Sequence, residues 1–352
     1  MSSIHPELRR CVILFVLTGL CVFYVFGTQW LGGSPFTDPK IGFGAAKFAI
    51  TLMGILLAHE LGHYFVAKRH GFALSLPVFI PVPFAFGTLG AVIQLRSLPK
   101  SRSALLEMGA AGPLAGFVLS VLAFCIGLPM TEDVGAVQIP LSDLAIAADS
   151  EPGWIEEWLL GYPWLFWPFE QLVLLLEWLG AVPTEPGVPL MILADPPLLK
   201  GLGLIILGEV PSRYASLDPI AFAGWVGCLL TAMNLVPIGQ LDGGHMMNAC
   251  APRKAKVISK AILLVLIFSA VIWTGWLVWA VALVVMRAYV SLPIPEESSL
   301  TSRAKVIMGL TVVAFACCFM PQPVMLENVG IDDIIWLDED GHAVPFPEEL
   351  RE

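Results

Sequence analysis

Long apolar runs dominate this chain and leave few folds open to it. Of its 352 residues, 57% are hydrophobic and 14% are charged, whereas soluble domains contain about a quarter charged residues. A helix needs about 20 mostly apolar residues to cross a hydrocarbon core of ~30 Å. The runs predict an all-α polytopic membrane protein with about six transmembrane helices, at Cys11 to Leu31, Phe43 to Ala67, Met108 to Met130, Pro219 to Leu241, Ala261 to Val285 and, shortest, Lys305 to Met320.

The basic residues indicate how these spans are oriented. One side of the arrangement, which the positive-inside rule makes cytoplasmic, carries Arg9, Arg10, Lys68, Arg69, Arg96, Lys100, Arg102, Arg253, Lys254, Lys256 and Lys260. The connection from Thr131 to Leu217 on the other side carries only the basic residues Lys200 and Arg213. An even number of spans places both termini on the cytoplasmic side. No small-residue cleavage site follows the first run, which favours a retained helix over a signal peptide, and no Arg/Ser-rich leader is present. We therefore expect a multi-pass protein of a prokaryotic plasma (inner) membrane with a cytoplasmic N-terminus. The net charge of −10 makes nucleic acid an unexpected partner.

Two connections stand apart from the spans. Residues Phe72 to Leu98, rich in Pro and Gly, alternate partly at their end, which predicts a short membrane-associated β segment after the second helix. The external insertion 131–217 contains an acidic, Trp-rich stretch from Trp154 to Val182, and this composition favours an interfacial helix over a further pair of spans. We expect residues 1–325 to form one transmembrane domain, and the acidic residues 326–352 a solvated C-terminal tail.

The second span ends in the sequence His59-Glu60-Leu61-Gly62-His63. On a helix, residues four apart lie one turn above each other, so both histidines can bind one zinc ion, while the intervening glutamate lies beside the metal. Zinc with three protein ligands lowers the pKa of its bound water, and Glu60 is placed to take the proton. The alternative, that these are polar contacts between helices, requires an unpaired ionised glutamate near hydrocarbon.

A third ligand is expected near the end of the fourth span, which reads NLVPIGQLDGG. Asp242 offers a carboxylate oxygen there, and Pro237, Gly239 and the Gly243-Gly244 pair break the helix so that its end can turn inward. Alone, Asp242 is better interpreted as an ordinary turn residue. With the HExxH motif on the same side of the membrane, it becomes the predicted third ligand.

Together the two motifs resemble the paired signatures of the site-2 protease family of intramembrane zinc metalloproteases. The resemblance implies that His59, His63 and Asp242 bind one zinc ion per chain and that Glu60 is the catalytic base. It also implies that Asn234 orients substrate or stabilises an oxyanion, although an amide joining two helices is nearly as good an interpretation. The expected substrates are membrane proteins, cut in or near their transmembrane segments in regulated intramembrane proteolysis.

Cleavage needs an extended substrate, because a helix hides its carbonyl groups in its own hydrogen bonds. The segment GTLGAVIQL, with Gly87, Gly90 and Val92, could hold such a substrate by strand pairing. Gly112 and Gly116 form a small-xxx-small pair, which predicts close helix packing. His245 either supports the site or faces the cytosol.

Three other functions remain to be weighed. A zinc or proton transporter could use the same His and Asp residues, but ionisable groups would then be spread along several spans. A prenyl-protein protease shares HExxH but would be expected to use a glutamate as third ligand. An inactive relative would be expected to lack part of the catalytic set, and none is missing here.

Overall fold

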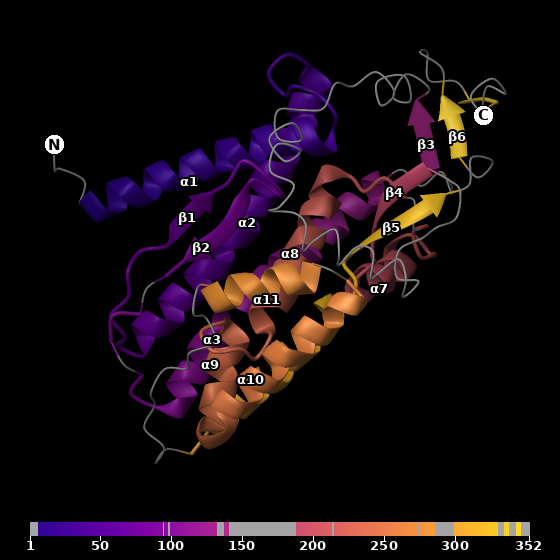
Figure 1. The fold of residues 1–352 in the computed structure, drawn as a ribbon. Coiled ribbons are helices and arrows are strands. Elements are labelled where there is room, and N and C mark those ends of the chain that lie inside the picture. The colour runs from indigo at the N-terminus through magenta and orange to yellow at the C-terminus, as the bar shows by residue number, and fades with distance from the viewer. Residues whose placement is uncertain are drawn as a thin grey trace, which may run out of the picture.

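The structure, a computed structural model, describes residues 6–93, 95–97, 99–131, 137–140, 188–212, 215–273, 275–285, 299–329, 334–337 and 343–345. The predicted interfacial helix at 154–182 lies outside these residues. The described chain is mostly helical (Figure 1).

Three helices are long and apolar enough to cross a membrane. Helix α1 (Pro6–Val25) continues into a π-helical turn, η1 (Phe26–Trp30); α2 spans Pro39–Arg69; and α3 (Arg102–Gly127) continues into a 3₁₀ turn, η2 (Leu128–Met130). These helices coincide with the first three predicted spans. The protein is therefore an integral membrane protein.

The remaining apolar helices are shorter. They are α7 (Pro197–Ile206), α8 (Pro219–Leu235), α10 (Pro252–Phe268), α11 (Gly275–Val285) and α12 (Ser302–Cys318), and the polar helix α9 (Asp242–Cys250) lies between α8 and α10. Each is below the ~20 residues of a typical crossing helix. Three of the six predicted spans thus meet the length criterion as single helices.

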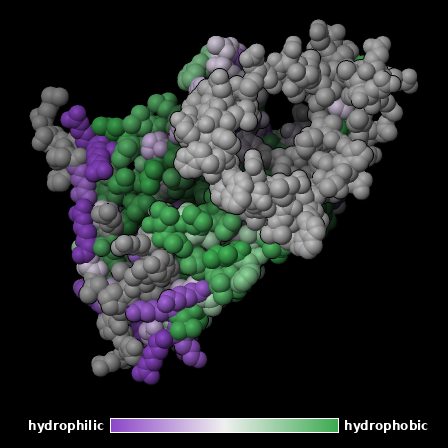
Figure 2. Space-filling view, in the orientation of Figure 1, coloured by the Kyte–Doolittle hydropathy of each residue, from purple (hydrophilic) through white to green (hydrophobic). Residues whose placement is uncertain are grey.

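Helix α3 lies at the centre of the molecule, packed along both α2 and α8. The fully buried side chains Phe48 and Leu52 of α2, Phe124 of α3 and Trp225 of α8 belong to one hydrophobic cluster. Figure 2 shows hydrophobic residues covering the broad middle of the visible face, with hydrophilic residues along its lower and left margins. Such a distribution suits a protein whose flanks face lipid.

The predicted β segment is a two-stranded antiparallel hairpin. Strand β1 (Val78–Pro81) pairs with β2 (Thr88–Val92), with Val78 opposite Val92 and Phe79 opposite Ala91. Helix α1 packs against β1, where the ring centroids of Phe15 and Phe79 are 5.0 Å apart. The hairpin therefore lies between α1 and the rest of the helices, as Figure 1 shows.

The predicted span Ala261 to Val285 is wrong as a single helix. Helix α10 ends at Phe268, a 3₁₀ turn (η3, Ser269–Val271) follows, and α11 begins at Gly275. The hydroxyl of Ser269 donates to the carbonyl of Val265, the indole of Trp276 donates to the carbonyl of Pro321 at 2.7 Å, and Gly275 has low helix propensity. The apolar run stays continuous while the backbone turns.

The C-terminal residues also differ from the expected solvated tail. Strand β5 (Val324–Val329) crosses the boundary expected at 325/326 and pairs antiparallel with β4 (Val188–Leu193). Strand β6 (Ile334–Leu337) pairs in parallel with β3 (Val137–Pro140) and antiparallel with β7 (Ala343–Val344). Ile334 and Trp336 are buried despite the acidic composition around them. The pairing partners come from the insertion, which local composition cannot reveal.

Candidate metal centre

Helix α2 presents the first two histidines. Its N-terminus is capped by Asp38, whose carboxylate accepts hydrogen bonds from the backbone N–H groups of Lys40 and Ile41, and Pro39 occupies the first helical position. His59 and His63 lie one turn apart on this helix, with ring centroids 4.9 Å apart. The motif spacing is thus realised on one face, as the sequence predicts.

A break after α8 brings in Asp242. The chain leaves the helix after Leu235, and a short connection follows in which the backbone N–H of Gly239 donates to the hydroxyl of Ser259 on α10. Helix α9 then begins at Asp242. The Gly243-Gly244 pair does not break the helix, as we expected it to; it lies within α9, where a Cβ at either position would overlap backbone carbonyls of the preceding connection. These glycines permit the close approach that turns α9 back.

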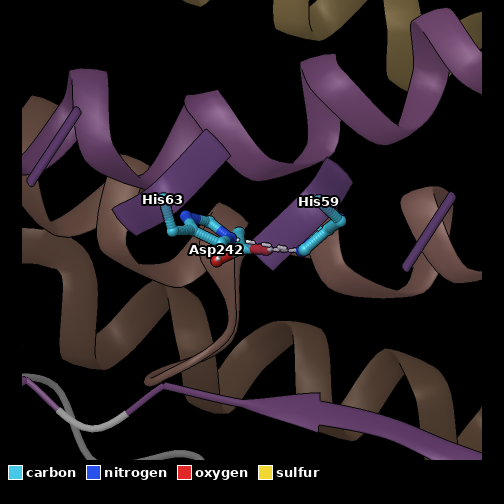
Figure 3. A group of neighbouring side chains, drawn as sticks. All are labelled: His59, His63 and Asp242. Atoms are coloured by element: carbon cyan, nitrogen blue, oxygen red, sulfur yellow. Dashed lines mark hydrogen bonds and ion pairs between the residues drawn. The ribbon is translucent and has the colours of Figure 1, made fainter. Parts of the chain in front are cut away.

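The three side chains converge on one point (Figure 3). The Nε2 atoms of His59 and His63 are 3.2 Å apart, and each lies 3.2 Å from a different carboxylate oxygen of Asp242. Among the described residues this is the one group of three or more His, Cys, Asp or Glu side chains placed to bind a metal, with all donor atoms within 4.8 Å of one another. Burial would raise the pKa of Asp242, but the two imidazoles outweigh it and hold that pKa below its usual range.

A backbone carbonyl fixes the orientation of one ring. His63 Nδ1–H donates to the carbonyl oxygen of Met108 on α3, at 2.8 Å. A carbonyl can only accept, so Nδ1 carries a proton, and in the neutral ring this leaves the Nε2 atom, which faces His59 and Asp242, free to bind a metal. This contact has no counterpart in the sequence motifs, because any residue at position 108 supplies the same carbonyl.

Glycines on α3 form the wall behind the rings. A Cβ on Gly112 would lie 2.6 Å from Cε1 of the His63 ring and closer still to its Nε2 and Cδ2 atoms, whereas a Cβ on Gly116 would lie 3.4 Å from Nδ1 of His59. Close packing of α3 on α2 is confirmed, since a Cβ on Gly62 would lie 2.5 Å from the carbonyl oxygen of Ala111. The small-xxx-small pattern therefore also makes room for the imidazoles, a role that the sequence analysis missed.

Two further ionisable side chains lie beside the three. Glu60 is buried with 6% of its surface exposed, and it is close enough to interact electrostatically with His59, His63 and Asp242. His245 lies one turn along α9 from Asp242. Its Nδ1 atom is buried and has no hydrogen-bond partner within the part of the chain that the structure describes.

Arg102 ties α9 to the first turn of α3. Its Nε donates to the carbonyl of Ala249 at 2.7 Å and its Nη2 to that of Cys250 at 2.8 Å. These carbonyls belong to the last turn of α9, where a cation also interacts favourably with the helix dipole. The short helix that begins with Asp242 is thus held at its other end by α3.

The remaining predicted site residues lie elsewhere. Asn234 is half-buried in the last turn of α8, and within the described residues it forms no hydrogen bond with the three converging side chains. Gly87 has a φ of +81°, and a Cβ there would overlap the backbone of Val22 on α1, so its glycine is explained by packing. Gly90 has a φ of +86° with open space around it, and Val92 is exposed.

Comparison with known proteins supports a common origin with metallopeptidases. Residues 47–274 match the model of peptidase family M50. The probable zinc metalloproteases EGY1 and EGY2 of Arabidopsis thaliana, both described as chloroplastic, are 30% identical over 225 residues and 27% identical over 277 residues. These alignments cover 63% and 78% of this chain but 32% and 40% of the relatives, so the chain spans about a third to two fifths of their length.

A solved structure, the site-2 protease from Methanocaldococcus jannaschii, is similar at 17% identity and a TM-score of 0.33, over 82% of this chain and 93% of that one. The family match extends from α2 to the end of α10 and beyond, and therefore includes His59, His63 and Asp242. Since it covers more than half of the chain, the protein belongs to peptidase family M50.

Proposed function

We propose that this protein is an intramembrane zinc metalloprotease that hydrolyses peptide bonds in or near the transmembrane segments of membrane proteins. The observation that carries the proposal is the convergence of His59, His63 and Asp242, with Glu60 beside them, at the end of a helix long enough to cross a membrane. Membership of a peptidase family supports the same activity.

The donor set fits one zinc ion per chain. In a tetrahedral site with zinc bonds of ~2.0–2.2 Å, neighbouring ligand atoms are separated by about 3.3–3.6 Å. The two Nε2 atoms are 3.2 Å apart and each lies 3.2 Å from one oxygen of Asp242, which is close to the lower end of that range. Two neutral imidazoles and one carboxylate also leave a position open for water, as catalytic zinc sites require.

Glu60 is the proposed general base. Zinc, when bound, activates water for attack at neutral pH. The carboxylate of Glu60 takes the proton of the attacking water and passes it to the nitrogen of the leaving amine, so that one group serves both steps. The hydrogen bond from His63 to Met108 keeps the imidazole oriented throughout. The family resemblance also assigns to Asn234 the positioning of substrate or stabilisation of the oxyanion, which its place in the last turn of α8 permits.

Strand β2 is the proposed docking edge for an unwound substrate. In the described residues β1 and β2 form a sheet of their own, and α1 packs against β1. The far edge of β2, with Gly90 and Val92, can therefore pair with an extended segment. We expect Val92→Pro to lower cleavage while zinc stays bound, and Val92→Ala, which keeps the backbone N–H, to have a smaller effect. Equal activity of the two variants would exclude this edge.

The proposed topology keeps about six crossings, with α8, α10–α11 and α12 adding to the three long helices. Lys68 and Arg69 lie in the last turn of α2, Arg102 begins α3, and both helix ends are those nearest the metal centre. Arg96 lies in the segment between β2 and α3. By the positive-inside rule this side is cytoplasmic. Membrane proteins with a transmembrane segment are then the partners, and regulated intramembrane proteolysis is the proposed setting.

A zinc or proton transporter is not favoured. It would require ionisable side chains along a path through several helices. Membership of a peptidase family and the carboxylate of Glu60 beside the three ligands both support hydrolysis instead.

Cleavage by matched carboxylate variants tests the proposal. Purified protein is incubated in detergent with a panel of single-span substrates, and products are detected by mass spectrometry. We expect Glu60→Gln to abolish cleavage and Glu209→Gln, which alters an exposed carboxylate on the loop after α7, to leave it unchanged. Cleavage should stop on chelation and return with zinc. Full activity of Glu60→Gln would refute the mechanism.

A further inference from the structure

A cavity of about 460 Å³ lies between the N-terminal part of α1 and the open end of the β1–β2 hairpin. It is lined by Glu7, Arg10 and Cys11 of α1 and by Ser75, Val78, Val92 and Arg96 of the hairpin segment. Its volume falls within the range of ligand-binding pockets. Apart from Val92, none of these residues takes part in the function proposed above.

The charges in this cavity favour a ligand with one negative charge. Nη2 of Arg96 forms an ion pair with Oε1 of Glu7 at 2.8 Å, and Arg10 adds a second cation that Glu7 cannot also neutralise. Guanidinium groups bind phosphate through paired N–H donors. A phosphodiester carries a single negative charge and so matches the net charge of the lining.

The position of the cavity favours a lipid as the carrier of that phosphodiester. Glu7 and Arg10 lie in the first turns of α1, at the start of the candidate span Glu7–Trp30, which places them at the membrane–water boundary, while Cys11, Val78 and Val92 extend the lining toward the apolar side. Along α1 the side chains of Val12, Ile13 and Val16 are about half exposed, which marks this helix as facing lipid. The lining therefore changes from charged to apolar at the depth where a phospholipid changes from its headgroup to its acyl chains.

An acidic side chain of a protein substrate is a less suitable ligand for this cavity. The lining comes from α1 and the hairpin segment alone, with no residue from α2, α3 or α9, the helices that surround His59, His63 and Asp242. We propose that this cavity binds the headgroup of an anionic phospholipid, with Arg10 and Arg96 on the phosphodiester and the apolar lining against the glycerol and first acyl carbons. Basic pockets on the cytoplasmic side of membrane proteins commonly bind such headgroups.

Native mass spectrometry of the full chain in detergent, titrated with phosphatidylglycerol or phosphatidylcholine, tests the site. Wild type should retain phosphatidylglycerol in preference to phosphatidylcholine. Arg10→Gln, which leaves the Arg96–Glu7 pair intact, should lower that preference about fivefold, the effect of losing one interfacial cation. Glu7→Gln removes the opposing charge and should raise it. The matched control Arg9→Gln loses the same charge at a neighbouring residue that does not line the cavity, and it should change the preference for phosphatidylglycerol little.

Several outcomes would overturn the proposal. Equal losses in Arg9→Gln and Arg10→Gln would show general surface attraction, and no preference in wild type would show that no such site exists. Displacement of the lipid by millimolar glycerol 3-phosphate would indicate a pocket for soluble phosphate instead. Binding of a short acidic peptide in the cavity that excess phosphatidylglycerol cannot displace would indicate a substrate subsite. Circular dichroism and zinc content of each variant separate loss of the site from misfolding, and neither depends on proteolysis.

Discussion

At the scale of single residues, Gly112 makes the metal centre possible by lacking a side chain. A Cβ there would overlap the His63 ring, which is held against α3 by its hydrogen bond to the carbonyl of Met108, one turn before Gly112 on the same helix. We expect Gly112→Ala to weaken zinc affinity by at least about tenfold, as displacement of a supporting contact does. Competition with a chromophoric chelator measures the change.

Gly116→Ala is the matched control, because its Cβ would meet His59 at an ordinary van der Waals distance of 3.4 Å. It should bind zinc nearly as well as wild type. If both alanine variants bind zinc normally, the wall of α3 does not constrain His63.

The contrast between these residues shows what sequence can reveal. Residue type and spacing predict His59, Glu60, His63 and Asp242 as site residues, because the proposed role of each belongs to a distinctive side chain. The carbonyl of Met108 is a backbone group, and Gly112 contributes by having no side chain. Neither contribution depends on a distinctive side chain, so neither is indicated by the motifs. Asn234 remains a proposal that the resemblance alone carries.

At the scale of elements, α9 depends on contacts at both ends. Its first residue is Asp242, and Arg102 binds the carbonyls of Ala249 and Cys250 in its last turn. We expect Arg102→Gln to lower zinc affinity about tenfold, because the ligand-bearing helix loses its anchor. The same chelator competition measures it.

Lys256→Gln, which removes an exposed cation from neighbouring α10, serves as the control and should leave zinc affinity unchanged. Wild-type affinity in Arg102→Gln would mean that α9 is positioned without this anchor. Rescue by Arg102→Lys should be partial, since an ammonium cannot reproduce the two-point contact.

Element boundaries were predicted unevenly. The long helices α1, α2 and α3 follow from continuous apolar runs, and the hairpin from alternation next to Pro and Gly. The run from Ala261 to Val285 kept its hydrophobicity across the break at Ser269–Val271, so hydropathy alone could not detect the turn. The bond from Trp276 to Pro321, 45 residues away, is a tertiary contact with no local sign.

At the scale of the whole molecule, an ion pair joins α2 to α8 far from the metal centre. Lys47 Nζ contacts Oδ2 of Asp218, and the Asp218 side chain is 7% exposed. Asp218 also caps α8 by accepting from the backbone N–H of Ile220. Lys47 precedes His59 by twelve residues, about 18 Å along the helix. We expect Lys47→Met to lower the free energy of unfolding by about 3 kcal/mol, because Asp218 is left buried and unpaired.

Thermal unfolding in detergent measures this loss, and zinc content should be unchanged below the transition. Lys40→Met, an exposed lysine in the first turn of the same helix, is the control. Unfolding of the Lys47 and Lys40 variants at the same temperature would show that the pair adds little to stability.

The global arrangement was only partly accessible from sequence. The meeting of α2 with the end of α8 was predicted from orientation and motif position. The pairing of β5 with β4 and of β6 with β3 was not, because it joins the tail to the insertion across more than 130 residues.

Zinc content is the most direct measure of the central claim, that His59, His63 and Asp242 hold a catalytic zinc ion. Elemental analysis of purified wild type should find roughly one zinc ion per chain. Glu60→Gln should keep it, because Glu60 is the proposed base and not a proposed ligand, and Asp242→Ala should lose it. A wild-type protein without zinc under metal-replete purification, or an Asp242→Ala variant that retains it fully, would contradict the account.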